Sequence, residues 1–190
     1  MISATAGVVV LCDANVLYKS LLRDLIVRLG QHGAISPRWT QRIHDEWVSN
    51  LLEHRLSLTR ARLETTCQRM NAALPHALLV TTEGEQHHLP DPDDQHVLDA
   101  ALQAEASLIL TFNLSDFPAS ALPAHLHAVH PDSFLQACLE QQENTVLDAL
   151  HELRANLKNP PFTPDELLAA MVRAELPAFA AQLQAFRDRF

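Results

Sequence analysis

A short apolar segment near the amino terminus, GVVVLCD from Gly7 to Asp13, constrains the fold more than any other part of the sequence. It is rich in β-branched valine, contains no polar side chain before its last position, and ends in an acid. An uninterrupted apolar run of this length, without alternation of polar and apolar residues, is typical of a buried strand in a parallel sheet. The segment therefore predicts such a strand with an aspartate at its carboxyl end.

Helical and strand patterns alternate along the chain that follows. Leucines recur every four residues from Leu17 to Leu29 and predict a helix that stops at Gly30 and Gly33. Further helices are predicted over residues 40–55, with Thr40 as N-cap, and over 57–74, 94–104 and 131–142; further strands are predicted in AISPRW, ALLVTTE, SLILTF and LHAVH. Strands that alternate with helices predict an α/β domain with a parallel sheet.

The region from Glu143 onward has a different pattern, because it is wholly helical apart from the connector NPPFTP. We expect residues 1–142 to form the α/β domain and residues 143–190 to form a helical extension too small for a core of its own. Its apolar side chains recur at helical spacing: Val146, Leu147, Leu150, Leu153, Leu157, Leu167, Leu168, Met171, Val172 and Leu176. Either they pack against the core of the α/β domain, or they form a docking arm for a partner or a second subunit.

Cysteine usage and hydropathy indicate a cytoplasmic protein without a membrane partner. Cys12, Cys67 and Cys138 are far apart and form no C-x-x-C motif, which favours free thiols in a reducing compartment. The amino terminus lacks the basic start of a signal peptide, and no apolar run approaches the roughly 20 residues of a membrane span.

Charge is unevenly distributed. The net charge of −9 argues against nucleic-acid binding by the surface as a whole, yet nine of the 14 lysines and arginines lie between Lys19 and Arg69. None lies between Met70 and Leu153, where acidic residues gather. This asymmetry indicates either an anionic substrate delivered to a cation site or a solvated basic helix face.

Acidic residues follow the predicted strands. Asp13 ends the first strand, Asn113 and Asp116 follow SLILTF, and Asp94 begins the helix before it. Ligands of open parallel sheets bind beyond the carboxyl ends of the strands, so these side chains are expected at one edge, with Glu46 as a further ligand. Each alone has an ordinary explanation as a cap, a turn or a solvated residue. Together they predict a site for Mg²⁺ or Mn²⁺, which prefer oxygen ligands.

Four segments, LCDANVL, RWTQRIHDEW, DPDDQHVLDAAL and LTFNLSDFP, together resemble the PIN-domain family, which includes the VapC-type toxins of bacterial toxin–antitoxin pairs. The resemblance covers roughly residues 7–140. It implies a three-layer α/β/α fold with four or five parallel strands, and metal-dependent cleavage of RNA. It also implies an antitoxin partner; a second copy of the chain is a further candidate partner.

The resemblance assigns roles to individual residues. It implies catalytic roles for Asp13, Glu46, Asp94 and Asp116, and metal ligation by Asp13, Asp94, Asp116 and Asn113. Asn113 stands where many relatives have aspartate, which weakens its assignment as a ligand. Asp94 is preferred to Asp93 because Val97, Leu98 and Ala101 then point inward.

Basic residues near Glu46 are candidates for the substrate track. We expect contacts with RNA phosphates from Arg38, Arg42 and Arg55. Two other functions remain open: a PIN-like module that binds RNA or protein without cutting, and a structure-specific DNA nuclease. The histidines of HLHAVH, at positions 125, 127 and 130, either lie on the surface or bind zinc.

Overall fold

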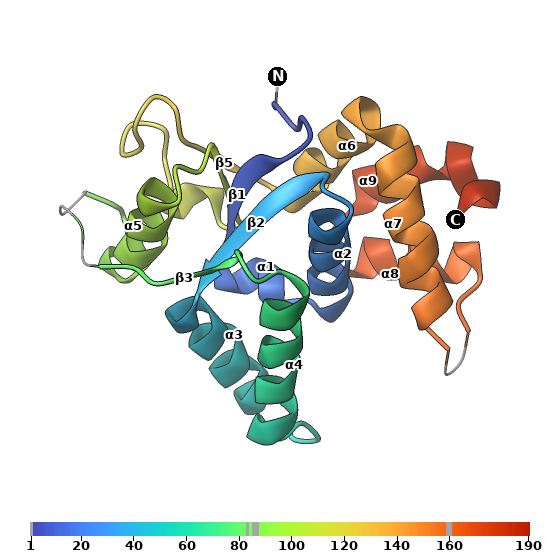
Figure 1. Ribbon diagram of the computed structural model, residues 1–190, viewed down its shortest axis with the longest axis horizontal. Helices are drawn as coiled ribbons and strands as arrows, with labels where there is room; N and C mark the ends of the chain where they lie inside the picture. The colour runs from blue at the N-terminus through green and yellow to red at the C-terminus, as the bar shows by residue number, and fades with distance from the viewer. Residues whose placement is uncertain (1, 83, 85–87, 159–160) are drawn as a thin grey trace.

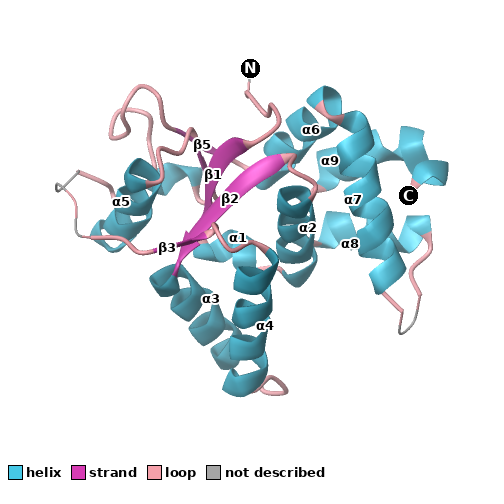
Figure 2. Ribbon diagram, viewed as in Figure 1, coloured by secondary structure: helices cyan, strands magenta, loops and turns pink. Residues whose placement is uncertain are grey.

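A parallel five-stranded sheet lies at the centre of the molecule, with helices on both sides (Figures 1 and 2). The computed structural model describes residues 2–82, 84, 88–158 and 161–190. The strands are β1 (Val8–Cys12), β2 (Ile35–Thr40), β3 (Leu78–Leu79), β4 (Leu108–Leu110) and β5 (His127–Val129), in the order β3-β2-β1-β4-β5. The predicted α/β/α architecture with a parallel sheet is confirmed.

The helices surround this sheet in two layers. They are α1 (Ala14–Tyr18), α2 (Ser20–Gln31), α3 (Gln41–His54), α4 (Arg60–Ala73), α5 (Gln95–Gln103), α6 (Pro131–Gln141), α7 (Glu143–Asn156), α8 (Pro164–Arg173) and α9 (Pro177–Leu183). Short 3₁₀ helices occur as η1 (Pro92–Asp94), η2 (Leu114–Asp116) and η3 (Gln184–Arg189). Figure 1 shows α5 on one side of the sheet and α2, α6 and α7 on the other.

The strand order reverses direction between β1 and β4. Residue Leu11 of β1 is paired with Arg38 of β2 on one side, and Cys12 is paired with Leu110 of β4 on the other. The chain leaves β1 toward β2 and leaves β4 toward β5, so the two connections diverge. A crevice for ligands is expected at such a point, beyond the carboxyl ends of β1 and β4.

A buried histidine holds α3 in place against β2 and α4. The indole N–H of Trp47 donates to His44 Nδ1 at 3.0 Å, and His44 Nε2 lies 3.2 Å from Asn71 Oδ1. Asn71 Oδ1 also accepts from Trp39 Nε1 at 2.8 Å. Burial lowers the pKa of His44, which keeps the ring neutral and Nδ1 available as an acceptor. The network fixes the position of α3, which carries Glu46.

The strand predicted in ALLVTTE is wrong in its length. Only Leu78 and Leu79 form β3, where they pair with Trp39 and Thr40, and Val80 is 96% exposed. The reason is that β2 ends at Thr40, whose side chain accepts from the N–H of Ile43 and caps α3, so the ladder has no further partner. The last residue of the predicted segment, Glu83, lies outside the described residues.

The helices of residues 143–190 pack against the rest of the chain. α7 contacts α2, and α9 contacts α6, and their apolar side chains belong to the same hydrophobic core as the sheet. The apolar stripes are buried as predicted, except that Leu157 is half-buried and Val172 is 52% exposed. Thr163 caps α8 through a capping box with Glu166, as its sequence position predicts. Packing on the chain's own core, rather than a free docking arm, is therefore confirmed for these stripes.

Candidate active site

The carboxylate of Asp13 lies at the carboxyl end of β1, where the chain turns into α1. It is 7% exposed, and its Oδ1 accepts from the backbone N–H of Ala14 at 2.6 Å. Its Oδ2 accepts from Asn15 Nδ2 at 2.6 Å and from the hydroxyl of Thr111 at 2.7 Å. Burial raises the pKa of Asp13, while the hydrogen bonds from Thr111 and Ala14 act in the opposite direction. The carboxylate is thereby held in one orientation.

Asn15 and Thr111 join the ends of the two central strands. The side-chain amide of Asn15 also lies 3.0 Å from Thr111 Oγ1, and its Oδ1 accepts from the N–H of Phe112 at 3.1 Å. The N–H of Asn113 donates to Thr111 Oγ1 at 3.0 Å. Because the segment after β4 is tied to α1 in this way, η2 and its Asp116 start from a fixed point beside Asp13.

Asp94, at the end of η1, interacts electrostatically with the other acids at the carboxyl edge of the sheet. Burial, and then the negative charges of Asp13, Asp116 and Asp91, raise the pKa of Asp94 to about 6. Burial and neighbouring like charges both disfavour the ionised form of a carboxyl group. Asp91 itself caps η1, where its side chain accepts from the N–H of Asp93 at 2.9 Å. Asp91 is thus an N-cap, and Asp94 is the residue of η1 whose pKa responds to the neighbouring acids.

Glu46 enters the same group of charges from α3. Its Oε1 lies 2.9 Å from His96 Nε2 and 3.3 Å from Arg42 Nε. Arg42 also donates to the carbonyl of Asp93 at 3.3 Å, so it joins α3 to η1. The negative charge of Glu46 contributes to the raised pKa of Asp13. Both partners contact one oxygen, Oε1, and together they orient the carboxylate of Glu46.

The donor set suits a hard divalent cation. Aspartate and glutamate oxygens are the ligands that Mg²⁺ and Mn²⁺ prefer, and a cation would relieve the repulsion that raises the pKa of Asp94. Within the part of the chain that the structure describes, no three carboxylate, imidazole or thiol groups converge closely enough to hold an ion by themselves. The acids interact through space without forming a closed ligand cage.

The remaining predicted site residues lie at different distances from this crevice. Arg42 contacts Glu46, whereas Arg38 donates to Ser36 Oγ at 2.8 Å on β2. Arg55 follows the last residue of α3, nine residues or about 13 Å along the helix from Glu46 at ~1.5 Å per residue. The structure brings Arg42 to the acids and places Arg55 at the far end of α3.

Three residues of the site were not predicted from the sequence: Asn15, Thr111 and His96. Asn15 lies two residues after Asp13, and Thr111 opens the motif that ends in Asp116, so both stand inside segments that define the family resemblance. His96 follows Asp94 by two residues. Its Nε2 contact with Glu46 joins α5 to α3, which sequence spacing does not reveal.

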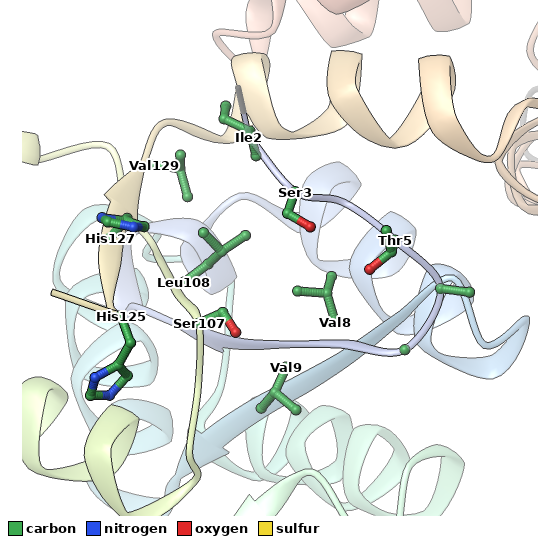
Figure 3. A pocket seen from close by; sticks show the side chains of 12 residues that line it. Ile2, Ser3, Thr5, Val8, Val9, Ser107, Leu108, His125, His127 and Val129 are labelled. Carbon is green, nitrogen blue, oxygen red and sulfur yellow. The ribbon is translucent and has the colours of Figure 1, made fainter.

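The zinc interpretation of the HLHAVH histidines has no support in the structure. His125 and His127 lie together on one wall of a cavity of about 800 Å³, lined also by Val8 and Ser107 (Figure 3). This cavity lies at the amino ends of the strands, opposite the acidic crevice. His130 instead caps α6, where its Nδ1 accepts from the N–H of Asp132 at 3.2 Å. No metal-binding group forms there among the described residues.

Comparison with known families identifies the class of protein that this fold and crevice define. Residues 9–115 match the family model described as PIN domain, and the chain belongs to that family. Residues 131–185 match a second model, described as VapC50 C-terminal domain. The resemblance of the acidic motifs to PIN domains is thereby confirmed, and so is the presence of a helical C-terminal extension.

One relative carries the same designation, VapC50, as the second family model. The protein named "Putative ribonuclease VapC50" from Mycobacterium tuberculosis (strain ATCC 25618 / H37Rv) is 40% identical over 90 residues, which are 47% of this chain and 53% of that protein. The match thus spans about half the length of the relative. No solved structure matches the chain significantly. In the described residues, no helix is long and apolar enough to cross a membrane.

Proposed function

We propose that the chain is a metal-dependent endoribonuclease of the VapC type that acts in the cytoplasm with Mg²⁺ or Mn²⁺. The observation that carries the proposal is the group of four carboxylates, Asp13, Glu46, Asp94 and Asp116, at the carboxyl edge of a PIN-family sheet. The ribonuclease name of the relative that is 40% identical supports RNA as the substrate.

The chain's own residues prepare the site for phosphodiester hydrolysis. Asp13, Asp94 and Asp116 would hold the cation, with Asn113 as a weaker candidate for a ligand. The cation, when bound, supplies neutralisation of charge on the scissile phosphate and an activated water. Burial raises the pKa of Asp13, and the hydrogen bond from Thr111 to Oδ2 favours the ionised form in opposition to it. Arg42, beside Glu46, is placed to contact a phosphate oxygen of the strand that is cut.

Cleavage of RNA by the purified full-length chain tests the proposal. With Mg²⁺ or Mn²⁺ the chain is expected to cut RNA, and excess EDTA is expected to stop it. Asp13→Asn should reduce cleavage by about 100-fold or more while the protein stays folded, since a metal ligand is removed. Asp148→Asn, on the exposed face of α7, is the matched control and should cut normally. Undiminished cleavage in EDTA would rule the mechanism out.

The same assay separates the other two functions. A chain that binds RNA but does not cut it with either metal would be a binding module. Cleavage of structured DNA with RNA left intact would identify a DNA nuclease instead. The acidic crevice favours the nuclease over the binding module, because clustered carboxylates repel RNA phosphates unless a cation lies between them.

The proposal extends to a partner protein. An antitoxin that places an arginine in the crevice would neutralise the carboxylates that otherwise hold the cation, through charge-assisted hydrogen bonds. Expression of the chain alone is expected to inhibit growth, and Asp94→Ala is expected to relieve the inhibition. Normal growth of cells that contain active enzyme without any partner would contradict the toxin role.

A further inference from the structure

A second cavity, of about 760 Å³, lies at the end of α1 away from Asp13 and is lined by basic side chains. It is bounded by the junction of α1 and α2, the end of α3, α4, and α8 of the C-terminal region. Its lining contains five basic side chains, Lys19, Arg23, Arg55, Arg62 and Arg173, and no acidic residue among the described residues. The lining of this cavity is therefore positively charged, although the chain as a whole has a net charge of −9.

Most of these cations have no counter-ion among the residues that the structure describes. Arg55, Arg62 and Arg173 form no ion pair with any residue that the structure describes. Lys19 is the exception, because its Nζ lies 3.0 Å from Glu175 Oε1. Like charges that share one cavity repel one another, and an anionic ligand would relieve that repulsion.

Arg23 gives the cavity a fixed positive charge. Its guanidinium lies 4.5 Å from the ring centroid of Trp47, and its Nη1 donates to the carbonyl of Leu17 at 2.5 Å. Burial lowers the pKa of Arg23 to about 10, so the side chain is still charged at neutral pH. Arg23 forms no ion pair with a described carboxylate, and a desolvated charge without such a pair is costly, which again favours an anion in the cavity.

The cavity and the catalytic crevice lie at opposite ends of one short helix. α1 begins after Asp13 and ends at Tyr18, a rise of about 8 Å at ~1.5 Å per residue. Lys19 Nζ lies 4.6 Å from the ring centroid of Phe112, which follows Thr111 of the crevice. A nucleic-acid strand bound at the carboxylates is therefore within reach of the basic cavity.

We propose that this cavity binds the phosphates of single-stranded RNA that flank the bond to be cut, and that Arg173 is the contribution of the C-terminal region to substrate binding. The inference rests on the proposed function, since it assigns a second part of the substrate path. The hydroxyl groups of Ser20, Ser57 and Thr66, which also line the cavity, are donors suited to phosphate oxygens.

The test measures RNA binding without cleavage. A labelled single-stranded oligoribonucleotide is titrated with full-length chain in EDTA at several salt concentrations. Arg62→Ala/Arg173→Ala is the test variant, because both side chains are exposed and neither forms an ion pair with a described residue. Lys158→Ala/Arg187→Ala is the control, with the same change of charge on exposed side chains outside the cavity.

The expected result is a decrease in affinity of roughly tenfold near 0.15 M salt for the test variant and little change for the control. The slope of log affinity against log salt should fall by about 0.7 for each phosphate that the variant no longer binds. Equal affinity and equal slope in the two variants would overturn the proposal. So would retention of RNA binding by the test variant together with loss of binding to an acidic peptide, which would identify a protein partner as the occupant.

This measurement does not depend on catalysis. Salt-dependent binding through the cavity by a chain that never cuts RNA would leave the cavity assigned and the nuclease function refuted. If the chain cuts RNA but the test and control variants bind RNA equally well, the nuclease function stands and the assignment of the cavity is refuted.

Discussion

The raised pKa of Asp94 makes the stability of the folded chain depend on pH. Its folded pKa of about 6 lies above the value of 3.8 for an isolated aspartate. Between these values the folded chain binds more protons than the unfolded chain, so stability falls as pH rises through this window. Above about pH 6 the carboxylate is ionised and the repulsion from Asp13 and Asp116 is present in full.

Asp94→Asn is therefore expected to stabilise the chain while it abolishes cleavage. The free energy of unfolding should rise by about 1 kcal/mol near pH 7.5, a value reduced for solvent screening of a half-exposed group. The gain should shrink as pH falls from about 6 toward 4. Urea unfolding at several pH values measures it, with Asp148→Asn as the control. A variant less stable than the parent chain at neutral pH would contradict this origin of the pKa shift.

Single residues also show how far the sequence predicts the site. Asp13 could be predicted as functional because a short apolar strand ends in it, and Asp94 because it begins a helix whose Val97 and Leu98 are buried. The contact between Asp13 and Thr111 joins residues 98 positions apart. It depends on β4 lying next to β1, which the pattern of one strand does not specify.

At the scale of elements, the long helices were predictable and the edge of the sheet was not. Helix periodicity is a property of one segment, and α3 follows it closely, whereas the predicted helix that contains Leu17 to Leu29 is broken at Lys19 into α1 and α2. A strand at the edge depends on its neighbour: β3 has two residues because β2 stops at Thr40. The apolar composition of ALLV therefore indicates a strand but not its length.

Asp132 determines how α9 is attached to α6. It is 8% exposed, and its two carboxylate oxygens accept from the backbone N–H groups of Ala178 and Phe179 at 3.0 and 2.8 Å. Asp132→Ala leaves both donors without this partner and should lower the free energy of unfolding by about 2 kcal/mol. Asp132→Asn, which keeps one acceptor, should cost about half as much. Guanidinium unfolding of the three proteins is the measurement, and identical midpoints would show that the cap is unimportant.

The whole molecule combines two oppositely charged sites around one short helix. Asp13 caps the amino end of α1 and belongs to the acidic crevice, while Tyr18 and Lys19 at its other end line the basic cavity. The C-terminal helices complete the second site through α8 and contact Lys19 through Glu175. They therefore cover the core and also form part of the wall of the basic cavity.

Deletion of residues 143–190 is expected to unfold or aggregate the remainder, although the predicted domain boundary places a complete domain before it. Five leucines of the deleted part, at positions 147, 150, 153, 167 and 168, are almost fully buried. At about 1.5–3 kcal/mol for each buried side chain, their contribution approaches or exceeds the roughly 5–15 kcal/mol that stabilises a typical domain. Residues 1–142 alone should therefore show no cooperative thermal unfolding by circular dichroism.

Co-expression of residues 143–190 as a separate chain should restore solubility, because it covers α2 and α6 again. A monomeric, cooperatively unfolding fragment with the parent's melting temperature would instead show that residues 1–142 are an independent domain and that the extension serves binding alone.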